Sequence, residues 1–322
     1  MKNMKNAYPK CATTFKNWYK SNVKYEEIYK KIGCPIPFDV TLRDGLQSLS
    51  KEEQLNFTTR DKLNMYYGLT SLHNIKNIEI GSLVSKSILP VFQDTIYFSD
   101  KIRKYEFNND NNPNNYILIP NRENLKKVID NTDIHNFLFI TSVSNSFQLK
   151  NTKMTLKDSD DDINGMLSDL YEKTDREKKP KIKLYVSCVT ECPLQGKIDN
   201  DFIIHRLLNL NKMNVNTICI SDTCGTLDVD DFEYIVETCM YFGLPSTKLS
   251  LHLHVKPGRE YMIEKIMYKA LNLNINNFDV SALESGGCSV TMDKTKLKPN
   301  LSYDLYYSIL CNYISMKSEL LD

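Results

Sequence analysis

The chain has 322 residues and a formal net charge of +1 at pH 7, with 41% hydrophobic and 25% charged residues. This composition suits a soluble globular protein with a sizeable core, and its balanced charge gives no electrostatic attraction to nucleic acid or anionic membranes. No apolar run approaches the roughly 20 residues that span a bilayer. We therefore expect neither nucleic acid nor a membrane as a partner.

The first 35 residues predict a helical extension rather than a targeting signal. The stretch is basic and amphipathic, but it lacks the apolar core of a secretory signal and the arginines of a transit peptide. Nine cysteines without a C-x-x-C pair indicate reduced thiols in a reducing compartment. We predict a cytoplasmic protein with an extension over residues 1–35 and one catalytic domain over residues 36–322.

Eight short β-rich runs, separated mostly by polar segments compatible with helices, predict an α/β fold. Most runs are continuously apolar, which is typical of parallel strands covered on both faces. Repeated strand–helix alternation favours a (β/α)8 TIM barrel over a doubly wound open sheet. The predicted strands are Phe38–Leu42, Asn77–Ile80, Tyr116–Ile119, Phe137–Thr141, Lys181–Val186, Thr217–Ile220, Leu249–Leu253 and Asn277–Val280.

The segments between the strands carry helical patterns, for example Val229–Tyr241 and Tyr261–Leu273, and a last helix is expected at about Ser302–Leu320. Two segments look irregular. The Asn-rich stretch Asn108–Asn115 predicts an exposed loop, and Asn151–Asn164 carries a run of acidic residues ahead of a helix.

Polar side chains follow most of the predicted strands. Catalytic groups of TIM barrels lie just after the carboxyl ends of the strands. Arg43 and Asp44 follow the first strand, Glu79 lies within the second, Asp222 follows the sixth, and Cys288 ends a Gly-Gly-Cys segment after the eighth. Helix capping explains one or two such clusters, but polar groups after most of the strands indicate an active site.

His252 and His254 form the sharpest pair. Alternate residues of a strand point to the same face, so both imidazoles are directed to the barrel mouth. With Asp44 as an oxygen ligand they predict a mixed nitrogen and oxygen metal site, suited to Mg, Mn, Zn or Fe.

Eight short stretches occur in the order in which one family carries them. They are DVTLRDGLQ (Asp39–Gln47), IEIGSLVS (Ile78–Ser85), SVSNSFQLKNTK (Ser142–Lys153), YVSCVTECPLQGKI (Tyr185–Ile198), SDTCGTL (Ser221–Leu227), HLH (His252–His254), GGC (Gly286–Cys288) and PNLS (Pro299–Ser302). Together they resemble hydroxymethylglutaryl-CoA lyase, within the metal-dependent TIM-barrel lyases and Claisen-type synthases. The Gly-Gly-Cys segment favours the lyase, because the synthases typically read like GERAGN there.

The resemblance implies Asp44, His252, His254 and Asn300 as ligands of a divalent metal, with Mg or Mn most expected. One departure stands beside this set. Val255 occupies the position after the second histidine, where the family usually has an aspartate that would orient a ligand.

The resemblance also implies roles for the other polar groups. Arg43 would face the thioester carbonyl, Glu79 and Asp222 would support the site, and Cys288 would lie on a mobile loop over the substrate. The lysines chosen as candidates for the CoA phosphates are Lys150, Lys153 and Lys197.

The implied reaction is a retro-Claisen cleavage of 3-hydroxy-3-methylglutaryl-CoA, or a close 3-hydroxyacyl-CoA, to acetyl-CoA and acetoacetate. The expected partner is an acyl-CoA thioester, and a homodimer stays open. Two alternatives remain at this point: a Claisen-type synthase that condenses an acyl-CoA with a 2-oxo acid, and an inactive barrel that serves as a binding module.

Overall fold

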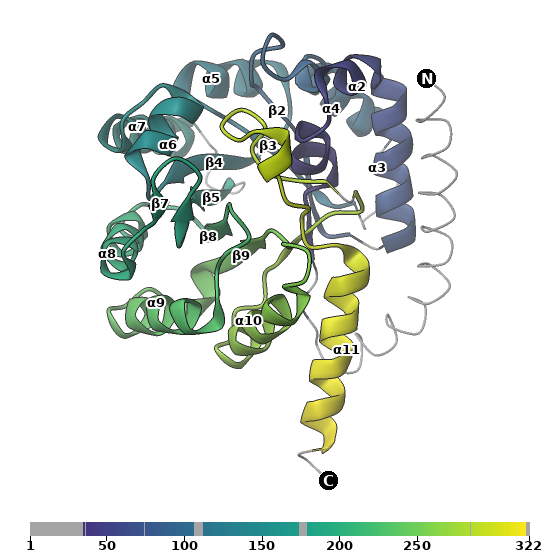
Figure 1. The fold of residues 1–322 in the computed structure, drawn as a ribbon. Coiled ribbons are helices and arrows are strands. Elements are labelled where there is room, and N and C mark those ends of the chain that lie inside the picture. Colours follow the sequence, from purple (N-terminus) through teal and green to yellow (C-terminus); the bar gives the residue numbers. More distant parts are fainter. Residues whose placement is uncertain are drawn as a thin grey trace.

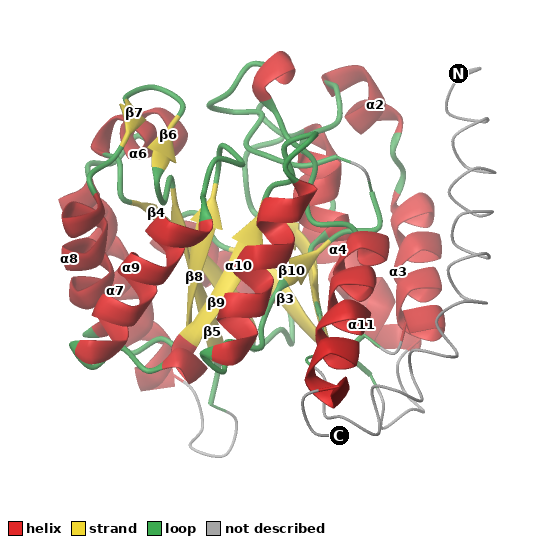
Figure 2. Ribbon diagram, turned by 60° about the horizontal axis from the view of Figure 1, so that its bottom comes forward, coloured by secondary structure: helices red, strands yellow, loops and turns green. Residues whose placement is uncertain are grey.

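The computed structural model describes residues 35, 37–73, 75–105, 112–173, 179–283 and 285–319. The predicted N-terminal extension lies outside these residues except for Pro35. The described part forms the expected (β/α)8 barrel, with parallel strands at the centre and helices around them (Figures 1 and 2). None of its helices combines the length and apolar character needed to cross a membrane.

The strands follow one another around the barrel in the order β10-β1-β2-β3-β4-β5-β8-β9. An isolated parallel bridge between Leu251 and Phe278 closes the ring, and the Leu251 N–H donates to the Asn277 carbonyl at 2.9 Å. Each predicted run overlaps one strand. The strands are β1 (Phe38–Asp39), β2 (Asn77–Ser82), β3 (Asn114–Leu118), β4 (Asn136–Ser142), β5 (Lys181–Ser187), β8 (Thr217–Asp222), β9 (Leu249–Leu253) and β10 (Asp279–Val280).

The first predicted strand is wrong at its end. β1 stops at Asp39, and Thr41–Gly45 form a π-helical turn, η1, in which the Asp44 and Gly45 N–H groups both return to the Val40 carbonyl, at 2.8 and 3.2 Å. Single π turns often occur at functional sites. Here the turn places Arg43 and Asp44 side by side at the barrel mouth.

The helices pack around the barrel (Figure 1). They are α2 (Lys51–Asn56), α3 (Thr59–His73), α4 (Thr95–Tyr105), α5 (Arg122–Asn131), α6 (Asn145–Thr152), α7 (Leu156–Lys173), α8 (Asn200–Asn211), α9 (Val229–Tyr241), α10 (Glu260–Asn272) and α11 (Tyr303–Glu319). A short hairpin, β6 (Glu191–Cys192) and β7 (Gly196–Lys197), lies between β5 and α8. Short 3-10 turns are η2 (Pro90–Phe92), η3 (Ser246–Lys248) and η4 (Lys294–Lys296).

The prediction that Asn151–Asn164 is irregular is wrong over most of its length, because α7 begins at Leu156 and contains the acidic run. Thr155 and Asp158 cap each other: the Thr155 hydroxyl donates to the Asp158 carboxylate at 2.7 Å and accepts from the Asp158 N–H at 3.1 Å. Acidic residues near a helix N-terminus are stabilising. Of the predicted loop Asn108–Asn115, residues 108–111 lie outside the described part, and the last two residues begin β3.

Asp39 is a buried carboxylic acid on β1. It accepts hydrogen bonds from the Thr41 N–H at 3.0 Å, the Thr41 hydroxyl at 2.9 Å and the Tyr303 hydroxyl of α11 at 2.7 Å. Burial raises the pKa of Asp39 from 3.8 to about 7, even though these hydrogen bonds lower it. The folded protein therefore binds more protons than the unfolded chain between these values, and this residue lowers stability as the pH rises through that window.

Replacing Asp39 by Asn should remove this pH dependence. A neutral amide can still accept from Thr41 and donate to the hydroxyl of Tyr303. At about 1.4 kcal/mol per pH unit, the variant should gain up to roughly 4 kcal/mol relative to the wild type between pH 4 and pH 8. Urea unfolding at both pH values checks this, and parallel stability changes in the two proteins would contradict it.

Candidate active site

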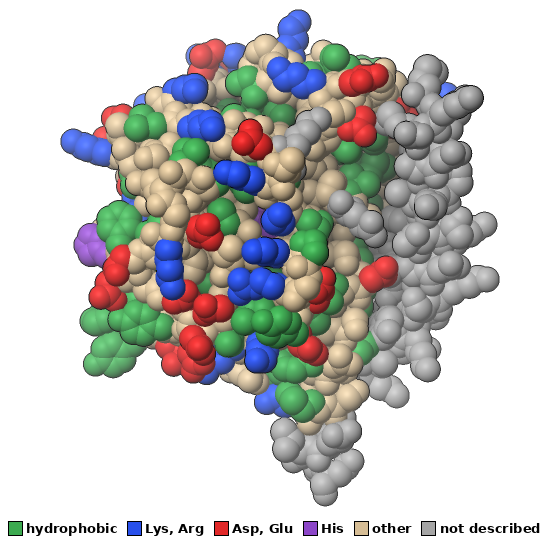
Figure 3. Space-filling model, in the orientation of Figure 1, with side chains coloured by type: hydrophobic (Ala, Val, Ile, Leu, Met, Phe, Trp, Pro, Cys, Tyr) green, Lys and Arg blue, Asp and Glu red, His purple; other side chains and the backbone are tan. Residues whose placement is uncertain are grey.

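A cavity of about 500 Å³ opens at the end of the barrel where the strands terminate. This end is uppermost in Figure 2, and Figure 3 shows Lys and Arg side chains gathered around the centre of the face that lies above the strands. The cavity brings together seven of the site residues predicted from the sequence: Arg43, Asp44, Lys150, Lys153, His252, His254 and Cys288.

Asp44, His252 and His254 form a buried cluster whose ligand atoms all lie within 4.8 Å of one another. The Nε2 atoms of His252 and His254 are 3.9 and 3.8 Å from the same oxygen of Asp44, Oδ2. Three such atoms around one point can share a single ion, because metal–ligand bonds to nitrogen and oxygen are roughly 2.0–2.2 Å long.

Two buried polar atoms beside this cluster have no hydrogen-bond partner in the described part of the chain: His254 Nε2 and Asn300 Oδ1. The amide of Asn300 donates to Asp44 Oδ2 at 2.9 Å and to the Ser285 carbonyl at 3.1 Å. Buried polar atoms are nearly always paired, so two unpaired acceptors next to a carboxylate fit a bound cation. The residues present therefore fit the divalent metal that the sequence predicts.

Each histidine is oriented through its other ring nitrogen. His252 Nδ1 lies 3.0 Å from Asp279 Oδ2, and His254 Nδ1 lies 2.9 Å from the Asp222 backbone carbonyl. Both rings therefore present Nε2 to the metal position. Val255 stands where the family usually has an aspartate, and its N–H donates to the Pro299 carbonyl. The two histidines are oriented without that aspartate, because Asp279 and the Asp222 carbonyl contact their Nδ1 atoms.

Asp279 was not among the site residues predicted from the sequence. An isolated acidic residue inside a predicted buried strand was the signal that could have found it, since such a charge requires a partner.

Arg43 is a fixed cation at the cavity wall. Its Nε donates to Glu79 of β2 in a close contact, and its Nη1 donates to Asp44 at 2.7 Å. Burial opposes the charges of Arg43 and Asp44, but their attraction outweighs it. The pKa of Arg43 is raised well above its ordinary value by Glu79 and then Asp44, and Arg43 holds the pKa of Asp44 well below its usual range. Glu79 therefore contacts Arg43 directly from β2.

Asp222 faces its own loop rather than the cavity. Its carboxylate accepts from the N–H groups of Thr226 and Leu227 at 3.0 and 3.1 Å, and burial raises its pKa to about 6. The contact of Asp222 with the site is through its backbone carbonyl, which orients His254.

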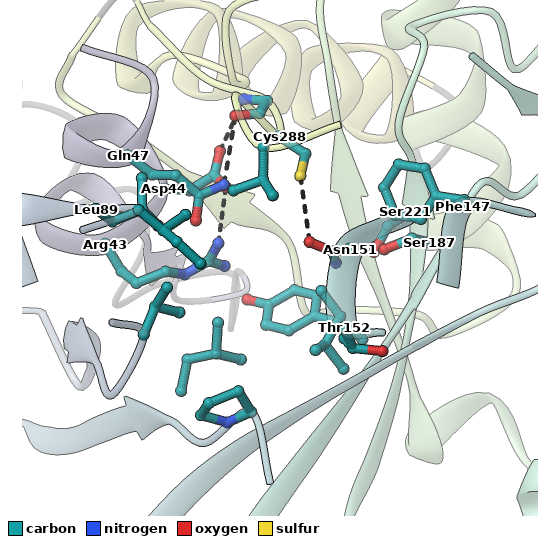
Figure 4. Close-up of a pocket in the computed structure, with 18 of the residues that line it drawn as sticks. Arg43, Asp44, Gln47, Leu89, Phe147, Asn151, Thr152, Ser187, Ser221 and Cys288 are labelled. Atoms are coloured by element: carbon teal, nitrogen blue, oxygen red, sulfur yellow. Dashed lines mark hydrogen bonds and ion pairs between the residues drawn. The ribbon is translucent and has the colours of Figure 1, made fainter. Parts of the chain in front are cut away.

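The loop after β10 folds over the cavity and carries Cys288. The Cys288 thiol points to Asn151, with Sγ 3.7 Å from the amide oxygen (Figure 4). Two contacts hold the loop to opposite sides of the rim: Ser289 Oγ donates to the Gln47 carbonyl at 2.8 Å, and Lys150 Nζ donates to the Thr291 carbonyl at 3.0 Å. Burial raises the pKa of Cys288, so the thiol keeps its proton. Glu284, at the start of this segment, lies outside the described residues.

Gly286 allows this loop to approach Asn300. A Cβ atom on Gly286 would lie 2.7 Å from Cγ and Nδ2 of Asn300, closer than side chains pack. Gly286→Ala should therefore displace Asn300 and weaken Mn²⁺ binding by ~10-fold or more. Gly165→Ala in α7 is the control, because its new Cβ meets only the flexible end of Arg122 at 3.3 Å. Isothermal titration with Mn²⁺ checks this, and equal affinity of the two variants would refute it.

The three lysines chosen as phosphate ligands separate in the structure. Lys150 and Lys153, at the end of α6, line the cavity. Lys197 does not: it lies on β7, is 71% exposed, and pairs with Asp231 at 3.2 Å. The β6–β7 hairpin turns it away from the cavity, so the geometry gives no support to Lys197 as a phosphate ligand.

Comparisons with known proteins agree with this geometry. The family model described as HMGL-like matches residues 35–259, well over half of the chain. Hydroxymethylglutaryl-CoA lyase of Pseudomonas mevalonii is 25% identical over 251 residues, which cover 78% of this chain and 77% of the relative. The cytoplasmic 3-hydroxy-3-methylglutaryl-CoA lyase of Rattus norvegicus is 25% identical over 252 residues, which cover 78% and 67%.

Solved structures show the same fold. The HMG-CoA lyase of Bacillus subtilis has a TM-score of 0.67 at 21% identity, with 86% of this chain and 85% of that chain covered. An HMG-CoA lyase of Acinetobacter baumannii, in complex with coenzyme A and 3-methylmalate, has a TM-score of 0.66 at 20% identity, with 89% and 84% covered. The extent of the family match, together with the strand-end site, shows that this chain belongs to the HMGL-like family.

Proposed function

We propose that the chain cleaves 3-hydroxy-3-methylglutaryl-CoA, or a close 3-hydroxyacyl-CoA, to acetyl-CoA and acetoacetate. The enzyme class, a carbon–carbon lyase, is that of its family and curated relatives. The observation that carries the proposal is the buried Arg43 guanidinium fixed beside the cluster of Asp44, His252 and His254 in one cavity. A cation next to a metal-ligand set is what a developing enolate requires.

Asp44, His252, His254 and Asn300 are the proposed ligands of a divalent metal, with Mg or Mn as the proposed ion. The unpaired Nε2 of His254 and Oδ1 of Asn300 support this set. When bound, such an ion supplies a Lewis acid that lowers the pKa of a hydroxyl group.

Arg43 stabilises the enolate of acetyl-CoA as the C2–C3 bond breaks and negative charge moves to the thioester oxygen. Its contacts with Glu79 and Asp44 hold the guanidinium before substrate binds, so little reorganisation is required during the reaction. The hydroxyl loses one proton as the new carbonyl of acetoacetate forms and the enolate carbon gains one, so the reaction is proton-neutral once solvent has reprotonated the group that donates to that carbon.

Cys288 is the proposed proton donor to the enolate carbon. Its protonated Sγ lies inside the cavity, on the loop that covers it. Closure of that loop over a bound substrate would exclude water, which otherwise weakens the electrostatic stabilisation of the enolate.

Lys150 and Lys153 are the proposed contacts for the CoA phosphates, because they bring positive charge to the cavity from α6. The related Acinetobacter lyase, whose structure contains coenzyme A, supports a CoA thioester as the partner. We further propose that residues 36–322 form one catalytic domain and that the protein is cytoplasmic. No disulfide joins any two cysteines in the described part of the chain, which fits a reducing compartment. A homodimer stays an untested prediction.

The deciding experiment is acetoacetate release from 3-hydroxy-3-methylglutaryl-CoA with Mg²⁺ or Mn²⁺, compared with the chelated protein. Release that depends on metal supports the lyase. A metal-loaded protein that releases none contradicts this substrate and favours another thioester or a synthase, which would liberate CoA from acetyl-CoA and a 2-oxo acid. A protein that binds no metal favours the binding module.

A further inference from the structure

The barrel interior contains a buried lysine that the proposed reaction does not use. Lys183 lies on β5, two residues before Tyr185, and its side chain is 3% exposed. TIM-barrel interiors are normally filled by branched aliphatic side chains, and an ammonium group is costly to bury unless it is paired. The aliphatic and aromatic part of this interior includes Phe38, Val40 and Leu138. Lys183 is therefore an unusual residue for the interior of a barrel, and its burial requires an explanation.

Lys183 pairs with Asp279, the residue that orients His252. Nζ of Lys183 makes a close contact with Asp279 Oδ1 and lies 3.8 Å from the ring centroid of Phe38. The other carboxylate oxygen, Oδ2, accepts from the Tyr185 hydroxyl at 2.7 Å and faces His252 Nδ1 at 3.0 Å. One carboxylate thus joins the lysine at one oxygen and the histidine at the other.

This arrangement selects one tautomer of His252. A neutral imidazole has a single N–H, and Asp279 as an acceptor places it on Nδ1. The lone pair of Nε2 then points to the metal position, 3.9 Å from Asp44 Oδ2. A carboxylate that moved by rotation would lose this contact, so the fixed position of Asp279 determines the direction of the ligand atom.

Lys183 supplies that fixed position. Tyr185 cannot do so alone, because its hydroxyl is shared with Glu79, to which it also makes a close contact, and a hydroxyl has one proton to donate. Lys183 binds Oδ1 and leaves Oδ2 for the imidazole.

We infer that Lys183 is a positioning residue of the metal site, which acts through Asp279 to hold His252 in the tautomer and orientation that a divalent cation binds. The inference rests on the metal site of the proposed function. It assigns to a residue deep in the barrel a role in metal affinity rather than in stability alone.

The full chain offers a matched control. Lys62 of α3 is also a buried lysine, 1% exposed, paired with Asp94 in a close contact and lying 5.4 Å from the ring of Phe98. It is not among the residues that line the cavity. Replacing either lysine by Met removes a buried cation from an ion pair, and Lys183→Met should lose more stability because Asp279 is fully buried while Asp94 is 20% exposed.

Isothermal titration with Mn²⁺ should show Lys183→Met binding 10- to 100-fold more weakly than the wild type, by roughly the loss that follows removal of a ligand-orienting group. Lys62→Met should bind like the wild type, and Lys183→Arg, which keeps the cation, should recover most of the affinity. The absorption spectrum of the Co²⁺-loaded protein should change in Lys183→Met and not in Lys62→Met.

Wild-type Mn²⁺ affinity in Lys183→Met, or equal weakening in both Met variants, would overturn the inference while leaving the lyase proposal intact. A wild-type protein that binds no Mn²⁺ would overturn both. If Lys183→Met fails to fold, Asp279→Asn serves instead, because it keeps the shape of the side chain and changes the group that faces His252. Unchanged Mn²⁺ affinity in Asp279→Asn would refute the inference as well.

Discussion

Arg43→Gln should lower kcat for acetoacetate release by ~10²- to 10³-fold, the usual cost of losing one group that stabilises a developing oxyanion. Mn²⁺ affinity should change little, because the Gly287 N–H and the Asn300 amide still hold Asp44 Oδ2. The guanidinium contacts Asp44 at 2.7 Å, so its removal takes a positive charge away from the proposed metal position. Steady-state kinetics with 3-hydroxy-3-methylglutaryl-CoA and titration with Mn²⁺ measure the two effects separately.

A second variant tests whether Arg43→Gln loses activity only because it loses stability. Without Arg43, the fully buried Glu79 keeps its contact with Tyr185 but loses its guanidinium partner. Leaving such a charge unpaired costs roughly 3–5 kcal/mol of stability. Arg43→Gln combined with Glu79→Gln should regain much of that stability and remain inactive. Activity within tenfold of the wild type in a folded Arg43→Gln variant would show that another group stabilises the enolate.

Much of the fold follows from local pattern. β9 and α9 have the same bounds as predicted, because apolar runs and amphipathic helices record burial directly in the sequence. The end of β1 does not follow from the hydrophobic pattern. The apolar residues continue past Asp39, and the turn at Thr41–Gly45 is set by backbone hydrogen bonds to one carbonyl, which side-chain hydrophobicity does not encode.

The candidate site shows the same division. Residues at strand ends could be selected from the sequence, because the topology of a parallel barrel brings all those ends to one face. The contacts among the residues beneath them could not, although Asp279 by itself stands out as an acidic residue within a predicted buried strand. Lys183, Tyr185 and Asp279 meet inside the barrel from β5 and β10, and their pairing depends on the closure of the ring. Lys197 shows the reverse case, since its position in the chain does not reveal the hairpin on which it lies outside the cavity lining.

Asp44→Ala should remove metal binding and activity together. Asp44 Oδ2 lies within 3.9 Å of both histidine Nε2 atoms and accepts from the Gly287 N–H at 3.1 Å and from Asn300 at 2.9 Å. The substitution therefore deletes one proposed ligand and the acceptor that holds a second. Loss of a ligand-orienting group costs 10- to 100-fold in affinity, so loss of Asp44 itself should cost ~100-fold or more.

Thermal unfolding with and without Mn²⁺ measures binding of the ion independently of catalysis. An ion at 100 times its dissociation constant stabilises a protein by about 2.7 kcal/mol, so the wild type should unfold at a higher temperature with Mn²⁺, and Asp44→Ala should not respond. Asp44→Asn separates the two functions of the side chain. Its amide oxygen can still accept from the Gly287 N–H, so the loop should stay closed. Loss of the negative charge should still lower the affinity for Mn²⁺. If Asp44→Ala keeps the full Mn²⁺-dependent stabilisation, the ion is held elsewhere, and the proposed ligand set is wrong even for an active lyase.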